Sequence, residues 1–366
     1  MDLIAPFISF IVSALLAFLT MPWLLNFCKR RGLYDMPNER KVHHNKIPRL
    51  GGVLFMPCTM VGLVVSLLFL LWCDGDMPRF TLSAFLISTG IFLIYLTGLL
   101  DDILGLPARI KFVIQLIASL FLPLCNLYIN NLYGFMGIYE IPMWIGYPLT
   151  AFLCLLIVNS VNLIDGIDGL ASGLSIVALT AFTIIFFQLG VSHYAIFTMG
   201  LLGGLSVFFY YNMFGKVENC TKTFMGDTGS LILGYSLSYL FFKLAMENNA
   251  VLPHMSDGLM VGATLLIVPT FDLIRVAMRR LMKGCSIFHA DKTHMHHRFL
   301  AAGFTMHQTL VIILAIQIGF CLLNAGLYSL KIGSTYILPI DIVLFILIQL
   351  YLDRRIKKVN DHASVD

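Results

Sequence analysis

Long runs of hydrophobic residues alternate with short polar stretches along the 366 residues of the chain. Most runs are close to 20 residues long, and about 20 apolar residues in an α-helix are needed to cross the hydrocarbon core of a bilayer. The pattern predicts an all-α integral membrane protein with about eleven transmembrane helices. The predicted spans are 3–27, 51–72, 81–100, 110–127, 147–164, 171–189, 194–213, 229–246, 257–278, 307–328 and 334–352.

The basic residues fall on one side of this topology. With eleven spans, alternate loops share a side, and one set of loops with the C-terminal tail holds 21 of the 24 Lys and Arg residues when Arg275, at a helix end, is counted with it. Because cytoplasmic loops carry the excess of Lys and Arg, we expect the N-terminus outside and the C-terminus in the cytoplasm. We expect one polytopic domain at 1–352 and a basic cytoplasmic tail at 353–366. The predicted cytoplasmic active-site loops are 28–50, 101–111, 160–170, 213–228 and 279–306.

The composition excludes a soluble fold. Only 12% of the residues are charged and 58% are hydrophobic, whereas soluble domains carry about 25% charged residues. The eight cysteines are scattered, without a C-x-x-C pair, which argues against a disulfide or metal framework. The first apolar run extends to about Phe27 and is followed by three basic residues. It is too long for a cleaved signal peptide, so we expect a retained first helix.

Unusual acidic residues lie at the cytoplasmic ends of the apolar runs. Asp101 and Asp102 close the third run in the sequence GLLDDILGL. Adjacent carboxylates repel each other, and such a pair could supply a base or help to hold a metal ion. The alternative is a solvated helix end. Arg109 and Lys111 follow shortly after, and we expect them to contact phosphate groups or lipid headgroups.

A second polar motif, NSVNLIDGIDGLASG, ends the fifth run. Asn159, Asn162, Asp165 and Asp168 recur every three residues, which places them along one stripe of a helix. Amide and carboxylate oxygens on one stripe suit a hard cation such as Mg²⁺. The alternative is a polar seam between helices.

The third motif, TFMGDTGSLILG, places Asp227 just before the eighth predicted span. The residues after Asp227 could open a helix whose free backbone N–H groups bind an anion. Alternatively, Asp227 is an ordinary helix N-cap, with the neighbouring glycines making the turn.

A histidine cluster forms the fourth motif, HADKTHMHHRF. His294, His296 and His297 lie close to Asp291 and to two basic residues. The spacing lacks the i, i+4 histidine pair of zinc peptidases, and the flanking cations favour phosphate binding. The alternative is a basic loop on anionic lipid. The first cytoplasmic loop, 28–50, is by composition an ordinary basic loop.

No dinucleotide, P-loop or serine-hydrolase motif accompanies these clusters. Carboxylates for a cation, basic groups for phosphates and a membrane face together indicate phosphoryl transfer that involves a lipid. A secondary transporter would place its acidic groups near the membrane midplane, often in paired repeats. A lipid-binding scaffold would not need so many acidic motif residues.

Five motifs in one order, between about Gly32 and Gly303, carry a family resemblance. They are D-x-P-N-x-R-K-x-H with I-P-R-x-G-G, the Asp101–Asp102 pair, N-L-I-D-G-I-D-G-L, F-M-G-D-T-G-S-L, and H-x-H-H followed by A-G-F. With these motifs the chain resembles the bacterial polyprenyl-phosphate N-acetylhexosamine-1-phosphate transferases, most closely the WecA-type branch. The phospho-N-acetylmuramoyl-pentapeptide transferases are more distant relatives.

The resemblance implies a reaction and a set of roles. A lipid phosphate attacks the β-phosphorus of a UDP-N-acetylhexosamine, giving a polyprenyl-diphospho-sugar and UMP, with Mg²⁺ required and Mn²⁺ as the alternative ion. The implied metal ligands are Asp227, Asn162 and Asp165. The implied catalytic residues are Asp101, Asp102 and Asp168, and the implied substrate-binding residues are His294, His296, His297, Lys111, Arg109 and Asp291.

The resemblance also implies partners and a location. The expected partners are a UDP-N-acetylhexosamine, undecaprenyl phosphate and membrane lipid, with no nucleic acid; a homodimer is left open. The expected location is the bacterial plasma membrane. The segment S-I-F-H-A-D-K departs at His289 and Ala290 from the S-P-F-x-P-D of similar sequences, so the sugar stays open, with N-acetylglucosamine expected. The H-M-H-H pattern disfavours the muramoyl-pentapeptide branch.

Overall fold

The computed structural model describes residues 3–35, 46–75, 81–247, 257–286 and 293–363. In these ranges the chain is mainly helical, with two small antiparallel hairpins, and the all-α fold class is confirmed. The elements are α1 (Ile4–Arg31), β1 (Tyr34–Asp35), β2 (Ile47–Pro48), the 3₁₀-helix η1 (Gly51–Leu54), α2 (Phe55–Asp74), α3 (Leu82–Leu104), α4 (Ala108–Leu124), β3 (Asn131–Phe135), β4 (Ile138–Glu140), α5 (Met143–Ile164), α6 (Leu170–Gln188), α7 (Ser192–Phe214), α8 (Gly226–Ala245), α9 (Gly258–Leu265), α10 (Ile267–Met282), α11 (Met295–Ala301), α12 (Met306–Ser329) and α13 (Ser334–Ala363).

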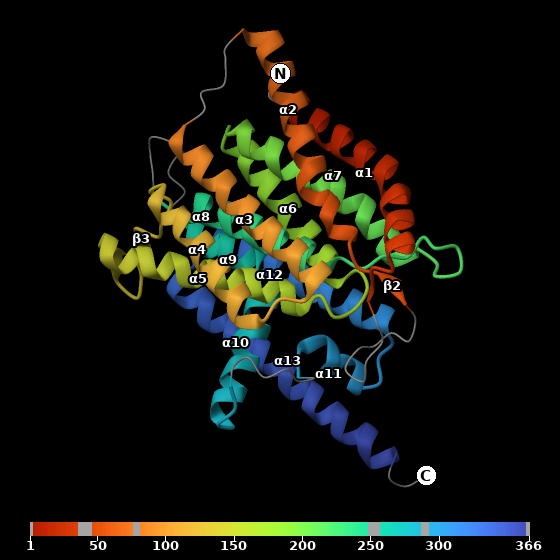
Figure 1. Ribbon diagram of the computed structural model, residues 1–366. Helices are drawn as coiled ribbons and strands as arrows, with labels where there is room; N and C mark the ends of the chain where they lie inside the picture. The colour runs from red at the N-terminus through yellow and green to blue at the C-terminus, as the bar shows by residue number, and fades with distance from the viewer. Residues whose placement is uncertain (1–2, 36–45, 76–80, 248–256, 287–292, 364–366) are drawn as a thin grey trace.

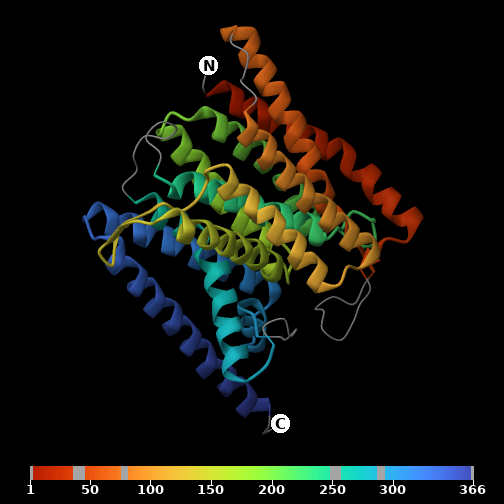
Figure 2. The ribbon, with the colours of Figure 1, turned by 60° about the vertical axis from the view of Figure 1, so that its left-hand side comes forward.

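Each predicted span coincides with a helix or with a pair of helices. Among the described residues, eight helices are long and apolar enough to cross a membrane, and the bent pair α9–α10 makes nine. The runs 110–127 and 229–246 form α4, with 17 residues, and α8, with 20 residues, which are not among these nine. The count of eleven therefore stays a prediction. The start of α1 and the end of α13 lie at opposite ends of the molecule (Figures 1 and 2), as an odd number of crossings requires.

Helix α8 lies in the middle of the bundle, and most of its side chains are buried. Its neighbours approach it closely because small residues face it. A Cβ atom on Gly98 of α3 would lie 2.4 Å from the Cα atom of Thr228, and one on Gly234 would lie 2.6 Å from the Cα atom of Val158 on α5. Small residues allow helix backbones to pack tightly in membranes. A central helix surrounded by other helices also needs less apolar surface than one that faces lipid.

The predicted span 257–278 is broken, and α9 and α10 meet at an angle of 77°. Pro269 contributes to this break, because proline has no N–H and its ring clashes with the carbonyl four residues earlier. The Gln317 side chain on α12 satisfies groups on both sides of the break: its Nε2 donates to the Thr264 carbonyl (2.9 Å), and its Oε1 accepts from Val268 N–H (3.2 Å). The bend directs α10 away from the bundle (Figure 1).

The orientation can be tested with two reporters. A reporter fused after Asp366 is expected to be cytoplasmic, and one inserted at the β3–β4 turn near Gly137 is expected to be external, because the basic residues assign these segments to opposite sides. The measurement is the activity of a reporter that works on one side of the membrane only. If both reporters were found on the same side of the membrane, the eleven-span topology would be contradicted.

Candidate active site

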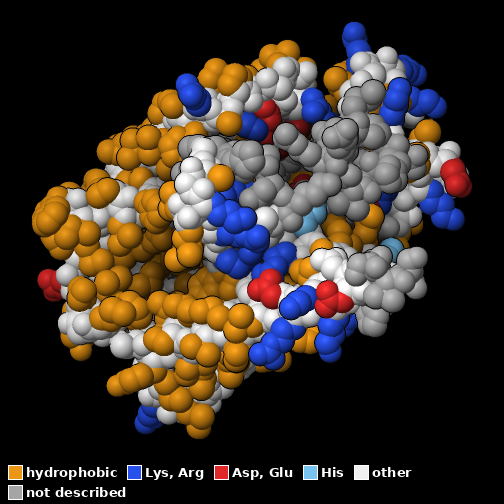
Figure 3. Space-filling view, turned by 90° about the horizontal axis from the view of Figure 1, so that it is seen from below, with side chains coloured by type: hydrophobic (Ala, Val, Ile, Leu, Met, Phe, Trp, Pro, Cys, Tyr) orange, Lys and Arg blue, Asp and Glu red, His pale blue; other side chains and the backbone are white. Residues whose placement is uncertain are grey.

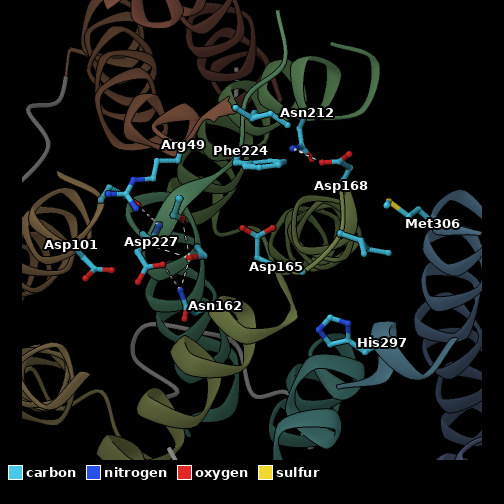
Figure 4. Close-up of a pocket in the computed structure, with 16 residues that line it drawn as sticks. Arg49, Asp101, Asn162, Asp165, Asp168, Asn212, Phe224, Asp227, His297 and Met306 are labelled. Atoms are coloured by element: carbon cyan, nitrogen blue, oxygen red, sulfur yellow. Dashed lines mark hydrogen bonds between the residues drawn. The ribbon is translucent and has the colours of Figure 1, made fainter. Parts of the chain in front are cut away.

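A cavity of about 400 Å³ opens at the end of the bundle from which α10 and α13 project. Figure 3 views this end, where acidic and histidine side chains lie in a hollow between Lys and Arg side chains. The cavity is lined by the motif residues from several helices (Figure 4): Asp101, Asp102, Asn162, Asp165, Asp168, Asp227 and His297. The separate sequence motifs therefore meet in one pocket.

Asp102 holds the start of α8. Its carboxylate is 4% exposed. Its Oδ1 accepts a hydrogen bond from the backbone N–H of Asp227 (2.9 Å), and its Oδ2 accepts from the N–H (2.9 Å) and the hydroxyl (2.6 Å) of Thr228. The first N–H groups of a helix have no partner within the helix, and a negative charge there is stabilising. Asp102 on α3 thus caps α8 from a neighbouring helix.

Gly226 makes this contact sterically feasible. Its φ is +71°, and a Cβ atom there would lie 2.6 Å from Asp102 Oδ2. An L side chain is disfavoured by the backbone conformation and excluded by the carboxylate. The glycine before Asp227 is therefore required by the cap.

Lys111 on α4 joins two of the carboxylates. Its Nζ lies 2.9 Å from Asp101 Oδ2 and 2.7 Å from Asp227 Oδ2. The other oxygen of Asp101 accepts from Leu106 N–H at 2.6 Å. The ammonium group thereby offsets the repulsion between two carboxylates. Arg109 is exposed and does not line the pocket, so only Lys111 of the two predicted basic residues reaches the site.

The predicted metal ligands are close together. Asn162 Nδ2 donates to Asp227 Oδ1 (3.3 Å) and to Ser230 Oγ (2.8 Å). Asp165, at the end of α5, points into the pocket (Figure 4). Although Asp165 is partly open to the solvent in the pocket, desolvation by nearby protein atoms, and then the negative charges of Asp227 and other nearby carboxylates, raise its pKa to about 7. A bound cation would oppose this shift by favouring the charged carboxylate.

These donors fit a hard cation only in part. Among the described residues no group of three His, Cys, Asp or Glu side chains is arranged to hold a metal ion. Asn162 presents its nitrogen to Asp227, so its oxygen must turn to become a ligand. Mg²⁺, however, is usually held by one or two carboxylates, with water and substrate phosphates completing the shell. Asp227 and Asp165 satisfy that requirement.

Asp168 lies on the other side of the pocket, beside α7. Its Oδ2 pairs with Lys222 Nζ at 2.7 Å, and its Oδ1 accepts from Asn212 Nδ2 at 3.4 Å. Asn212 Oδ1 in turn accepts from Gly169 N–H (2.7 Å). These contacts fix the loop between α5 and α6 against α7, so Asp168 is held in place while still facing the cavity.

The three histidines differ in position. His297 lines the cavity, whereas His294 and His296 are 5% and 2% exposed. The His296 ring lies against the α5–α6 loop, where a Cβ atom on Gly166 would be 2.1 Å from its Nε2. Burial, and then the charge of His297, lower the pKa of His296 to about 3. His296 is therefore neutral at physiological pH and cannot attract phosphate as a cation. Asp291, His289 and Ala290 lie outside the described residues.

Several pocket residues were not predicted from the sequence. Arg49 lines the cavity, although the composition of the loop 28–50 indicates only an ordinary basic loop. Asn212 and Lys222 fix Asp168, and the signal for Asn212 was a polar side chain near the end of an apolar run. Asp272 is buried next to His294. The signal for Asp272 was an acidic residue well inside the predicted span 257–278.

The bundle and its carboxylate-lined pocket define a polytopic membrane protein with a site suited to phosphate chemistry. Comparison with known proteins gives the family. Residues 84–245 match the model of glycosyl transferase family 4. The chain is 30% identical over 346 residues to a probable undecaprenyl-phosphate N-acetylglucosaminyl 1-phosphate transferase of Bacillus subtilis (strain 168), covering 92% of this chain and 89% of the relative.

Two further relatives are undecaprenyl-phosphate alpha-N-acetylglucosaminyl 1-phosphate transferases. The one from Yersinia pestis is 32% identical, over 77% of this chain and 73% of the relative. The one from Escherichia coli (strain K12) is 30% identical, over 78% and 74%. The chain belongs to glycosyl transferase family 4, and the predicted family resemblance is confirmed.

The pKa of Asp165 predicts how its replacement changes stability. A carboxyl group with a raised folded-state pKa binds its proton more tightly in the folded protein, so its contribution to stability is present at low pH and is lost as the pH rises through about 7. Asp165→Asn should therefore raise the melting temperature in EDTA more at pH 8 than at pH 5, and the gain should be small because the side chain is exposed in the pocket and solvent screens its charge. Thermal unfolding in detergent measures this shift.

The matched control is Glu218→Gln, an exposed carboxylate in the segment before α8. It should produce no gain that differs between the two pH values. An Asp165→Asn variant that is equally or less stable than the wild type at pH 8 would contradict the strained environment assigned to Asp165.

Proposed function

We propose that the protein transfers N-acetylglucosamine 1-phosphate from UDP-N-acetylglucosamine to undecaprenyl phosphate, releasing UMP, at the cytoplasmic face of a bacterial plasma membrane. The observation that carries the proposal is the pocket in which Asp101, Asp227 and Lys111 are joined. The relatives support the choice of substrates, because they are named undecaprenyl-phosphate N-acetylglucosaminyl 1-phosphate transferases.

In the proposed reaction an oxygen of undecaprenyl phosphate bonds to the β-phosphorus of the nucleotide sugar. The bond from that phosphorus to the bridging oxygen breaks, and UMP leaves with the electron pair. Asp227 and Asp165, with Asn162 after rotation of its amide, would hold Mg²⁺. The ion would neutralise phosphate charge and polarise the β-phosphorus. Catalysis in such reactions is mainly positioning and charge stabilisation.

The geometry favours different roles for the adjacent aspartates. Both oxygens of Asp102 are occupied by the start of α8, so we assign it to positioning Asp227. Asp101 shares Lys111 with Asp227, where the pair can orient the acceptor phosphate and accept its proton. On the opposite wall, Asp168 and His297 are placed to contact the nucleotide sugar.

The alternatives have less support. A phospho-N-acetylmuramoyl-pentapeptide transferase would share the chemistry. The relatives reported above, however, are named for the transfer of N-acetylglucosaminyl 1-phosphate. A proton-coupled transporter would need ionisable groups leading across the bilayer. The pocket acids instead gather at one end of the bundle.

The proposed function is tested with purified protein, Mg²⁺, undecaprenyl phosphate and a panel of UDP-sugars. We expect release of UMP with UDP-N-acetylglucosamine and loss of turnover in excess EDTA. Release of UMP with a different UDP-sugar only would overturn the sugar assignment, and full turnover in EDTA would overturn the Mg²⁺ assignment. No UMP with any sugar would refute the activity.

Substitutions separate the roles of the carboxylates. Asp227→Asn should lower the rate by orders of magnitude and weaken the apparent Mg²⁺ affinity, because a charged ligand is lost. Asp101→Asn should lower the rate by about 10²–10⁴-fold, the usual range for a proton-transfer group, with nearly unchanged Mg²⁺ affinity. The measurement is a Mg²⁺ titration of the rate for each purified variant.

Asp102→Asn provides the contrast for this series. It replaces a charged cap of α8 by a neutral one, so we expect a lower melting temperature together with a lower rate. Equal shifts of Mg²⁺ affinity in the Asp101 and Asp227 variants would refute the division of roles. Near wild-type rates in all three variants would refute the location of the site.

A further inference from the structure

Asp272 on α10 is a buried carboxylate that does not line the cavity. It is 1% exposed. Its Oδ1 accepts from Arg275 Nη2 (2.7 Å) and from the backbone N–H of Met295 (3.0 Å), and its Oδ2 lies 2.9 Å from His294 Nδ1. A buried carboxylate is costly unless it is paired and hydrogen-bonded. Both oxygens of Asp272 meet that condition through the start of α11.

These contacts attach α11 to α10. Helix α11 begins at Met295, and His294 provides no side-chain cap of its own. The Asp272 carboxylate supplies the missing acceptor for Met295 N–H. Arg275, one turn further along α10, also donates to the Thr293 carbonyl. Thr293, His294 and Met295, which lead into α11, are thus held by two side chains of α10.

The attachment also fixes the orientation of the histidines. With Nδ1 of His294 directed at Asp272, the ring is held edge-on to α10. The His294 and His296 rings are nearly parallel, with centroids 6.1 Å apart, and the His296 and His297 centroids are 4.2 Å apart. His297 is the member of this row that faces the cavity. A rotation of α11 would therefore move His297 relative to the pocket.

The direction of α10 is set by the break at its start. Gln317 satisfies the backbone groups on both sides of that break, and α10 then leaves the bundle toward α11 (Figure 2). Asp272 lies on the first half of α10, between the break and the end that projects from the bundle. The bent span α9–α10 therefore links the position of α11 to the packing of the membrane bundle.

We propose that Asp272 is a positioning residue for the nucleotide-sugar side of the active site. It caps α11 and orients His294, so that His297 is presented to the cavity. The inference rests on the proposed function, because it assigns His297 to the nucleotide sugar. It adds a residue outside the sequence motifs and gives the broken span a role in substrate binding.

The test is Asp272→Asn in the purified full chain. Asparagine keeps the size and one acceptor oxygen, but loses the charge that pairs with Arg275 and His294. We expect the KM for UDP-N-acetylglucosamine to rise about fivefold or more, in the range of coupling between contacting residues. The KM for undecaprenyl phosphate and the Mg²⁺ requirement should not change. Equal KM values for the nucleotide sugar in variant and wild type would overturn the proposal.

Asp341→Asn is the matched control. Asp341 is another fully buried aspartate, on α13, and it accepts a hydrogen bond from Asn324 Nδ2 at 2.9 Å. This partner lies on α12, and not on α11, so the replacement of Asp341 should leave both KM values unchanged. If both aspartate variants lose stability and neither changes the KM for the nucleotide sugar, Asp272 has only a structural role.

A double-mutant cycle tests whether Asp272 acts through α11. Because Asp272→Asn is expected to act on the nucleotide sugar through the position of His297, its combined effect on KM with His297→Ala should be smaller than the product of the single effects. A multiplicative result with His297→Ala would overturn the proposal. Should Asp272→Asn fail to fold, Arg275→Gln, which removes the second attachment, must raise the same KM.

A measurement without turnover separates this inference from the proposed function. In protein labelled with ¹⁵N-histidine, the His294 nitrogens should change their NMR signals in Asp272→Asn, because Nδ1 loses its carboxylate partner. Unchanged signals would overturn the positioning role. If the wild type releases no UMP while these signals change, the proposed function fails and the contact between Asp272 and α11 stands.

Discussion

The contact between the Asp102 carboxylate and the first N–H groups of α8 determines where Asp227 lies. A desolvated carboxylate and the partial positive charge of a helix N-terminus stabilise each other, and in a membrane protein such backbone groups need a partner within the protein. Gly226 leaves room for the carboxylate, and Gly98 lets α3 approach α8. Asp227 is thereby placed beside Lys111 and Asn162. If this cap were lost, Asp227 would no longer be held beside Lys111 and Asn162, and the carboxylates would not form one site.

A second carboxylate does the same at the histidine cluster. Asp272 accepts from the first N–H of α11, as Asp102 does at α8. In both cases the capping carboxylate lies on one helix, and the residue that it positions, Asp227 or His297, lies on a neighbouring helix. Gln317 satisfies the broken backbone before α10 in a comparable way. The site is therefore assembled by side chains that complete the ends of neighbouring helices, which ties its geometry to the packing of the bundle.

The sequence predicted the class of fold and the motifs that meet in the pocket, because lipid requires long apolar runs and acidic residues at their ends stand out. It did not distinguish Asp101 from Asp102. Successive residues on a helix point about 100° apart, and only the packed position of α8 decides that Asp102 faces it. Asp272 was missed because its partners His294 and Met295 lie more than 20 residues further along the chain, and only the packing of α11 against α10 brings them to it. The break before Pro269 was also missed, since residues 258–271 carry no charged side chain and resemble one continuous membrane span.

The central claim is that a phosphate, and not only a sugar, moves to the lipid. It is tested most directly with UDP-N-acetylglucosamine that carries ³²P in the β-phosphate, incubated with the protein, Mg²⁺ and undecaprenyl phosphate. The account predicts that the label enters the lipid fraction together with the sugar, while the released nucleotide is unlabelled UMP. Label that stays in the released nucleotide, as UDP, would mean that the sugar alone is transferred and would contradict the account.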